Sequence, residues 1–359
     1  MVNSIIMNES LRRLLELDLG AGPLLVLTHD NPDPDSIASA AGVALLLERA
    51  RGLEVTVGYS GIIGRAENRA MVEMLDLGIR HISELDVANF RHFALIDAQP
   101  YTGNSAIPDD RVPDIVIDHH PLREATRAAR FYDVRESLGA SATIVTGYLR
   151  DAGVEIPHDL ATALLYGIRS ETQDLGREAS DDDFDAYIYL FHLADTQKLA
   201  AISKPSLDPR YFAQLATALD SLMVGEHVSV CQLDHVMDPD FVPEMADFAV
   251  RIAGLRWSLV TGQYAHRLHL SIRSNEIEAN AGELMQELLH GLGRGGGHGM
   301  RGGGNIDLTS AGSSLEELQT TLRERFLELT GFAGEALIPM REHPNGQIGP
   351  VDGGTKTEN

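Results

Sequence analysis

Histidines and aspartates gather where apolar stretches of the sequence end, and the first such place is the segment 28–36. This segment holds His29, Asp33 and Asp35, with prolines at two of the positions between them. Neutral imidazole nitrogens and carboxylate oxygens together suit Mn²⁺, Fe²⁺, Zn²⁺ or Co²⁺. The same segment also fits the start of a helix, because Asp35 or Ser36 can serve as an N-cap. Taken alone, the segment leaves a metal site and a helix cap equally open.

Two more apolar stretches end in the same kinds of residue. Asp97 follows one of them, and Asp118, His119 and His120 follow the other. A single Asp after a strand is common among α/β proteins, whereas adjacent histidines at a strand end are uncommon. In parallel sheets ligands bind beyond the carboxyl ends of the strands, so these side chains are expected to meet. Their joint placement predicts a metal site rather than surface histidines in a turn.

A glycine-rich segment, residues 293–304, also contains Arg294, His298 and Arg301. Glycines let a ligand approach the backbone closely and expose N–H groups to anions. Arginine side chains add charge-assisted donors for phosphate. Because a flexible linker seldom carries this set of side chains, the segment predicts an anion-binding loop between a helix and a strand.

Apolar runs alternate with helical patterns over the first 200 residues, and this alternation is typical of a parallel, doubly wound α/β sheet. The expected strands cover 23–29, 53–60, 92–99 and 114–120, and the expected helices cover 36–51, 65–78, 141–153 and 158–172. From residue 225, alternating apolar and polar residues predict antiparallel strands and a smaller α+β domain. The predicted organisation is an α/β domain at 1–200, a helical connector at 201–224, the smaller domain at 225–337 and a flexible tail at 338–359.

The overall charge limits the ligands. The chain has 359 residues, of which 53 are acidic and 29 basic, so the formal net charge is -24. A protein that captures long nucleic acid duplexes normally presents a basic face, so that class is excluded. No apolar run approaches the roughly 20 residues of a membrane span, and no signal peptide pattern opens the sequence. With one cysteine, Cys231, the sequence predicts a cytoplasmic protein.

These motifs, in this order, resemble the DHH phosphoesterase family, which is named for the Asp-His-His triplet present here at 118–120. The resemblance extends over about residues 20 to 335 and includes a C-terminal DHH-associated domain with a Gly-Gly-Gly-His segment at 295–298. The length and two-domain plan look most like the nanoRNase and pAp-phosphatase branch. That branch degrades very short oligonucleotides and related mononucleotides.

The resemblance implies two divalent cations, Mn²⁺ first, with Mg²⁺, Co²⁺ or Fe²⁺ as alternatives. The implied roles are His29 and Asp33 as ligands of one ion, Asp35 and His119 of the other, Asp97 as the bridge, His120 as a contact of the scissile phosphate and Asp118 as the support of a histidine. The expected substrate contacts in the associated domain are Arg273, Arg294, Gly296, Gly297 and His298.

The fourth motif departs from the family pattern. The family usually reads Gly-Ile-x-x-Asp-Thr, whereas residues 167–172 place Glu171 at the position of the Asp ligand. Either the longer arm of Glu171 reaches the metal or Asp174 takes its place. The ligand set and the metal preference of the second ion depend on which of these holds.

The predicted function is metal-dependent hydrolysis of short oligonucleotides, including linear dinucleotides and also pAp, by a hydroxide that bridges the two cations. A homodimer is a further expectation from the resemblance. Two alternatives stay open, a cyclic dinucleotide phosphodiesterase and a nucleotide sensor without catalysis. The glycine-rich segment argues against a pyrophosphatase, and the net charge of -24 argues against a RecJ-type processive exonuclease.

Overall fold

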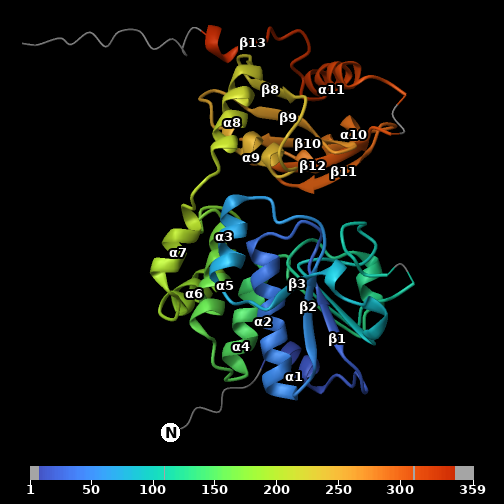
Figure 1. The fold of residues 1–359 in the computed structure, drawn as a ribbon, viewed down its shortest axis with the longest axis vertical. Helices are drawn as coiled ribbons and strands as arrows, with labels where there is room; N and C mark the ends of the chain where they lie inside the picture. Colours follow the sequence, from blue (N-terminus) through green and yellow to red (C-terminus); the bar gives the residue numbers. More distant parts are fainter. Residues whose placement is uncertain (1–7, 109, 310–311, 344–359) are drawn as a thin grey trace, which may run out of the picture. The chain divides into compact units, whose positions relative to one another are not determined.

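Six parallel strands form the sheet of the first of two units, which divide between Ser206 and Leu207 (Figure 1). The computed structural model describes residues 8–108, 110–309 and 312–343. The strand order is β3-β2-β1-β4-β5-β6, so the direction of winding reverses between β1 and β4. The strands are β1 (Leu24–Leu27), β2 (Val55–Tyr59), β3 (Ile79–His81), β4 (His92–Ile96), β5 (Ile115–Asp118) and β6 (Phe131–Val134). The predicted parallel α/β sheet is confirmed.

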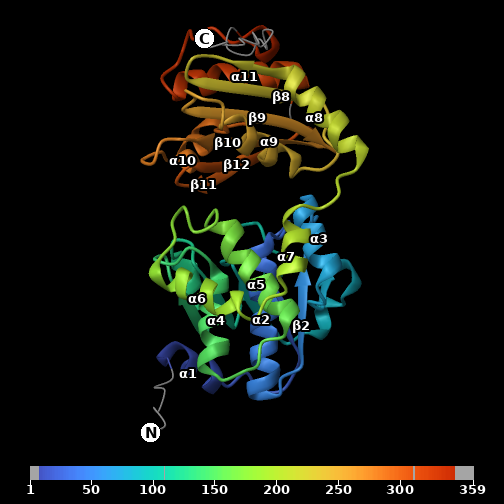
Figure 2. The same ribbon diagram turned by 90° about the vertical axis from the view of Figure 1, so that its left-hand side faces the viewer.

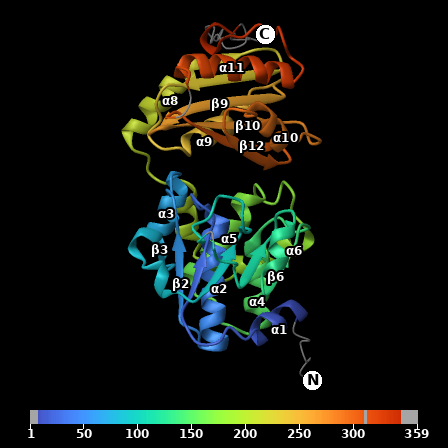
Figure 3. The ribbon, with the colours of Figure 1, turned by 90° about the vertical axis from the view of Figure 1, so that its right-hand side faces the viewer.

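The central strands are buried on both faces, as their unbroken apolar sequences require. One face packs on long helices, which lie toward the viewer in Figure 2. The helices of this unit are α1 (Glu9–Glu16), α2 (Pro34–Arg51), α3 (Ala66–Met74), α4 (Ser141–Asp151), α5 (His158–Glu171), α6 (Asp181–Phe191) and α7 (Thr196–Ser203). The other face, seen in Figure 3, is covered by loops and the short 3₁₀ helices η1 (Ile82–Glu84), η2 (Val87–Asn89) and η3 (Glu124–Ala128).

Helix α2 lies at the centre of the helical layer and is buried on nearly every side. Its small residues make this possible, because a Cβ added at Gly42 would lie 2.5 Å from Val145 Cγ1 on α4. Asp33 caps its N-terminus by accepting a hydrogen bond from Ser36 N at 2.9 Å. The helix therefore begins directly at the acidic segment, and its close packing fixes where that segment lies.

The second unit contains a seven-stranded sheet with the order β11-β12-β10-β9-β8-β7-β13. All neighbours are antiparallel except β8 and β9. The strands are β7 (Leu222–Val224), β8 (Val228–Leu233), β9 (Trp257–Tyr264), β10 (Arg267–Ser274), β11 (Arg294–His298), β12 (Arg301–Asp307) and β13 (Ile338–Pro339). Helices α10 (Ala281–Leu288) and α11 (Leu315–Leu329) cover one face, and α8 (Pro209–Ser221) and α9 (Phe241–Ala249) cover the other. This is the smaller α+β domain that the sequence predicts.

Three features of the fold differ from the sequence predictions. The helical connector at 201–224 is divided, because α7 belongs to the first unit while α8 packs on the second unit's sheet. The glycine-rich segment is a hairpin of β11 and β12 rather than a loop. The flexible tail expected from residue 338 begins with β13, which pairs with β7, and with the 3₁₀ helix η4 (Met340–Glu342). Residues 344–359 of that tail lie outside the described residues.

Among the described residues, no helix combines the length and the apolar character that crossing a membrane requires.

Candidate functional site

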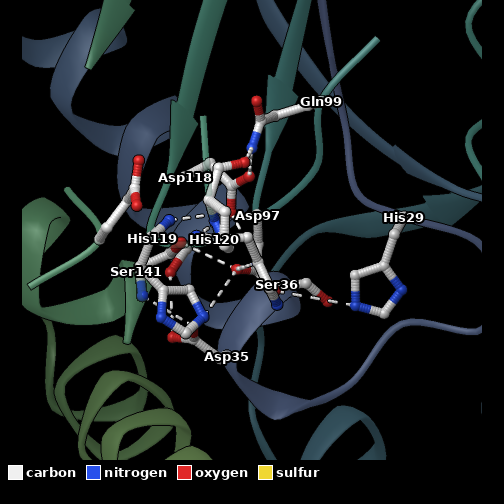
Figure 4. Close-up of polar contacts among 12 residues, drawn as sticks. His29, Asp35, Ser36, Asp97, Gln99, Asp118, His119, His120 and Ser141 are labelled. Atoms are coloured by element: carbon white, nitrogen blue, oxygen red, sulfur yellow. Dashed lines mark hydrogen bonds and ion pairs between the residues drawn. The ribbon is translucent and has the colours of Figure 1, made fainter. Parts of the chain in front are cut away.

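The carboxylate of Asp97 lies at the centre of a polar cluster at the carboxyl edge of the parallel sheet (Figure 4). It belongs to two groups of possible metal ligands, in each of which the ligand atoms lie within 4.8 Å of one another. One group joins Asp97 to His29 and Asp33, and the other joins it to His119 and His120. Asp97 is buried and has a φ of 57°, a left-handed conformation that side chains rarely adopt. Such strain at a polar centre is typical of functional positions.

Two histidines are anchored in the same way. His29 Nδ1 lies 2.9 Å from the carbonyl oxygen of Asp30, and His119 Nδ1 lies 3.2 Å from that of Leu138. In the neutral imidazole, an N–H donated to these carbonyls leaves each Nε2 with a lone pair. The Nε2 atoms lie 3.7 Å and 3.5 Å from carboxylate oxygens of Asp97.

His119 Nε2 gives the clearest test of whether the cluster suits a cation. This atom is buried and has no hydrogen-bond partner among the described residues. A buried acceptor without a partner is costly, whereas a bound cation would satisfy it. The donor set of imidazole nitrogens and carboxylates also suits Mn²⁺ and related divalent ions. The residues present therefore fit a metal centre.

Asp33, rather than Asp35 or Ser36, caps α2, and it is also one of the possible metal ligands. Its Oδ1 caps α2 through Ser36 N and also lies 3.7 Å from His29 Nε2. Burial opposes protonation of His29, but Asp33 and Asp97 outweigh it and raise the pKa of His29 to about 10. Carboxylates that hold a proton this strongly create a field that favours any cation at the same place.

Asp35 lies beside the two ligand groups rather than within them. Its side chain is fully buried, and its oxygens accept hydrogen bonds at 2.8 Å from Ser141 N and Ala142 N at the start of α4. Burial, and then the nearby carboxylates of Asp97, Asp33 and Glu171, raise the pKa of Asp35 well above its ordinary value. The N-terminus of α4 offsets part of this repulsion, and a cation would offset more.

Asp118 supports His120 and the backbone of the triplet. Its Oδ1 accepts hydrogen bonds from His120 Nδ1 and from His119 N, each at 2.8 Å. Burial opposes ionisation of Asp118, but His120 outweighs it and lowers the pKa of this carboxyl. In turn Asp118 and Asp97 overcome the burial of His120 and raise its pKa to about 10. Asp118 and Asp97 therefore favour the protonated form of His120 beside the shared carboxylate.

Two further side chains hold this cluster, and neither was predicted from the sequence. Gln99 Nε2 donates to Asp118 Oδ2 at 2.6 Å, and the hydroxyl of Ser141 donates to Asp97 Oδ1 at 2.9 Å. Gln99 lies two residues after Asp97, which is the only sequence signal for its role. Ser141 gives no such signal, because a serine at the start of a helix reads as an ordinary cap.

A third missed residue, Asp183, holds the loop between β6 and α4. Its fully buried carboxylate accepts hydrogen bonds from Gly139 N at 2.8 Å and from Ser180 N at 2.7 Å. The hydroxyls of Ser180 and Thr143 donate to it as well. The same loop carries the carbonyl of Leu138 that anchors His119, so Asp183 acts on the cluster through the backbone.

Glu171 and Asp174 lie in different environments. Glu171 ends α5 and is half-buried, and its charge acts on Asp35 and His120. Asp174 is 72% exposed and pairs with Arg169 at 2.7 Å. The structure therefore brings Glu171, and not Asp174, toward the cluster, although Glu171 lies outside both ligand groups.

The substrate contacts expected in the second unit lie on or next to the β11–β12 hairpin. Arg273 on β10 pairs in register with Arg301 on β12, and its guanidinium bonds Asp247 of α9 and Ser271 Oγ. Arg294 is exposed on β11. The remaining three expected contacts, Gly296, Gly297 and His298, follow it on the same strand and pair in register with residues of β12.

The two faces of the hairpin differ. A Cβ added at Gly302 would lie 2.4 Å from the carbonyl oxygen of Ala281 on α10, and one at Gly304 would lie 2.3 Å from Leu289. At Gly303, on the opposite face, the nearest atom is Leu270 O at 3.9 Å. Glycine is required on one face by the close approach of α10, whereas on the other face it leaves bare backbone that a ligand can approach.

A parallel α/β sheet with histidines and aspartates around one shared carboxylate defines the first unit as a candidate two-metal domain. Residues 23–168 match the DHH family, N-terminal domain, and this part of the chain is such a domain. The Asp-His-His triplet at 118–120 lies within the matched residues and begins at the last residue of β5.

Two groups of relatives share sequence with the chain. It is 34% identical over 322 residues to an uncharacterized protein of Methanocaldococcus jannaschii, a match that covers 87% of this chain and 65% of the relative. It is 29% identical over 155 residues to a probable manganese-dependent inorganic pyrophosphatase of Streptococcus pyogenes, which covers 42% and 48% respectively. The chain thus spans less than two thirds of the length of either relative.

Two solved structures share the fold. An exopolyphosphatase-related protein from Bacteroides fragilis superposes with a TM-score of 0.69 at 14% identity, over 87% of this chain and 94% of that chain. RecJ from Thermus thermophilus superposes with a TM-score of 0.53 at 16% identity, over 90% and 55%. At these identities the likeness concerns the fold alone.

Proposed function

We propose that this protein is a metal-dependent phosphoesterase that hydrolyses short oligonucleotides, linear dinucleotides above all, and also pAp. The observation that carries the proposal is the position of Asp97, which is shared by two groups of possible metal ligands. The sequence similarity to a probable manganese-dependent pyrophosphatase supports Mn²⁺ as the first candidate. Two divalent cations bound here would supply an activated water near neutral pH and Lewis-acid stabilisation of the phosphoryl oxygens.

The chain's own residues divide the remaining work. We assign His29, Asp33, Asp97 and His119 to metal binding, with Asp35 and Glu171 as further ligands. His120, kept positively charged by Asp118, would stabilise negative charge that develops on the phosphate. The contacts proposed for the substrate's phosphate or terminal nucleotide are Arg273, Arg294, Gly296, Gly297 and His298.

The preference for nucleotides over pyrophosphate rests on the second unit. The bare backbone of Gly303 and its neighbouring arginines belong to the β11–β12 hairpin of this unit. Backbone N–H groups and arginines suit a phosphate. A net charge of -24 speaks against long duplexes, so the proposed partner is a short oligonucleotide. A homodimer and a cytoplasmic location stay predictions.

One panel of substrates tests the proposal. The purified protein with Mn²⁺ is incubated with pApA, longer RNA, pAp, cyclic di-AMP and pyrophosphate. We expect fastest turnover of pApA. Preference for pyrophosphate would refute the nucleotide assignment, preference for cyclic di-AMP would favour the cyclic dinucleotide alternative, and no turnover of any member would refute the enzyme.

A matched pair of histidine variants ties the activity to the cluster. His119→Ala removes the buried Nε2 that faces Asp97, and we expect it to abolish turnover. His92→Ala removes a buried histidine at the opposite end of β4, where it pairs with Asp114 at 3.3 Å. Activity that survives in the first variant, or is lost equally in both, would contradict a specific role for His119.

A further inference from the structure

The backbone directly after Asp97 makes a turn with an unusual residue at its tip. The turn runs from Gln99 to Thr102, with Pro100 at its second position and Tyr101 at its third, where the φ is 61°. The hydroxyl of Thr102 closes the turn by donating to the carbonyl oxygen of Gln99 at 3.0 Å. Proline followed by a positive φ is the pattern of a type II turn, in which the third position strongly favours glycine. A bulky tyrosine there is disfavoured locally, so its side chain calls for a reason.

Burial does not provide that reason. Tyr101 is 63% exposed, the largest exposed fraction among the exposed aromatic residues of the described chain. Its side chain makes no hydrogen bond, ion pair or ring contact with any of the described residues. A strained backbone that presents a largely exposed aromatic ring, without polar or ring partners among the described residues, is typical of a ring that binds a ligand.

Both ends of the turn are tied to the metal centre. On one side Gln99 donates to Asp118 at 2.6 Å. On the other side the carbonyl of Asn104 accepts from Asp30 N at 2.6 Å, and Ser105 pairs with His29. Along the chain, Tyr101 is two residues from Gln99 and three residues from Asn104. At about 3.5 Å per residue, its backbone lies within roughly 10 Å of residues that touch the centre.

We propose that Tyr101 is a nucleobase platform, on which the base of the nucleotide bound at the metal centre stacks. This inference rests on the proposed function, since it places a nucleotide phosphate at that centre. Stacking suits every base because each has a π face, so the platform accepts short oligonucleotides without reading their sequence. Pyrophosphate offers no base. Tyr101 therefore supplies, within the first unit, a preference for nucleotides that the metal ligands alone cannot give.

Three variants separate the ring from the backbone. Tyr101→Phe keeps the ring, Tyr101→Ala removes it, and Tyr101→Gly removes it while suiting the positive φ. Phe184→Ala, which removes another exposed aromatic ring on α6, is the matched control. Because Tyr101→Gly relaxes the turn, we expect its melting temperature to equal or exceed that of the wild type, which shows that the fold persists.

Binding is measured first, with 2-aminopurine riboside 5′-monophosphate in Mg²⁺, because stacking on an aromatic ring quenches its fluorescence. We expect quenching by the wild type, Tyr101→Phe and Phe184→Ala, and about tenfold weaker binding with little quenching by Tyr101→Ala and Tyr101→Gly. Ribose 5-phosphate has no base, so it should displace the probe with the same inhibition constant in the wild type and in all four variants. Equal quenching by wild type and Tyr101→Gly, or none by the wild type, would overturn the platform.

Turnover of pApA is measured separately, so that failure of the platform and failure of the proposed function are distinguishable. We expect Tyr101→Gly to raise KM about tenfold and to leave kcat within about twofold, because stacking binds the substrate and its transition state alike. Absence of turnover in the wild type would refute the proposed hydrolysis, while the quenching result would still decide the platform.

Discussion

The candidate metal centre of the first unit and the glycine hairpin of the second present polar groups in opposite ways. At the candidate centre the possible ligand atoms belong to side chains, and other groups fix the orientation of these side chains, as the carbonyl of Leu138 fixes that of His119. In the middle of the hairpin, glycines leave both faces without side chains, and the open face presents the backbone at Gly303. The centre is therefore assembled by contacts between distant segments, whereas the hairpin is shaped by packing against one helix, α10.

The two regions also bear different energetic costs. The centre gathers carboxylates whose burial, and then whose mutual repulsion, raise the pKa of Asp35 and of Asp97. That cost is electrostatic, and a cation would relieve it. The cost of the hairpin is the backbone entropy of its glycines, which close packing of α10 offsets. Charge changes should thus act mainly on the first region and volume changes mainly on the second.

The largest expected effect follows from removing the shared charge with Asp97→Asn. We expect activity to fall at least about a thousandfold, because both ligand groups lose their common carboxylate. Isothermal titration should show loss of at least one Mn²⁺. With a chelator present the variant should melt at or above the wild-type temperature, because a buried, repelled charge is gone. Lower stability under chelation would mean that the carboxylates are not in conflict.

The next effect tests whether distant contacts assemble the centre. Asp183→Asn places an amide where backbone and hydroxyl groups donate, so we expect a loss of about 1–3 kcal/mol in unfolding free energy. Because the loop it holds carries the anchor of His119, Mn²⁺ affinity should fall about tenfold.

Asp114→Asn is the control for this effect. Asp114 bonds His92 and Phe93 N at the opposite end of β4, away from the cluster. It should lower stability without changing Mn²⁺ affinity. Equal affinities in the two variants would show that Asp183 has only a structural role.

A pair of adjacent glycines tests the hairpin. Gly302→Ala would place a Cβ 2.4 Å from Ala281 O, so urea denaturation should show a loss of about 1–3 kcal/mol. Gly303→Ala meets nothing closer than 3.9 Å and should change stability by less than about 1 kcal/mol. Only this second variant obstructs the open face, so it should raise KM for pApA while the fold persists. If Gly302→Ala raises KM and Gly303→Ala lowers stability, Gly302 lies on the open face and Gly303 on the packed face, which would contradict the structure.

The same contrast explains what the sequence could predict. The meeting of His29, Asp97 and His119 was predictable, because each follows an apolar strand and parallel strands bring their carboxyl ends to one edge. Gln99, Ser141 and Asp183 were not, because their roles depend on partners up to 44 residues away. Nothing local distinguishes such a residue from an ordinary polar side chain.

The hairpin escaped prediction for a different reason. Glycine is depleted in strands because it costs entropy and has nothing to pack, so a run of glycines reads as a loop. Here α10 comes so close to the strand that only glycine fits at residues 302 and 304, on the face toward the helix. The helix that makes glycine favourable is α10, which precedes the hairpin in the chain. The sequence pattern does not predict that α10 packs on the hairpin.

The smallest effect concerns Glu171, where the chain departs from the usual Asp. Glu171→Asp shortens the arm by one methylene at the end of α5, beside Asp35 and His120. We expect less than about tenfold change in kcat with Mn²⁺, and a changed ratio of Mn²⁺ to Mg²⁺ activity, because Mg²⁺ tolerates little distortion of its octahedral geometry. Asp174→Ala removes an exposed ion pair with Arg169 and should change neither quantity. If the Asp174 variant shifts the metal ratio and the Glu171 variant does not, Asp174 is the ligand in place of Glu171, and the segment after α5 must move to bring Asp174 to the centre.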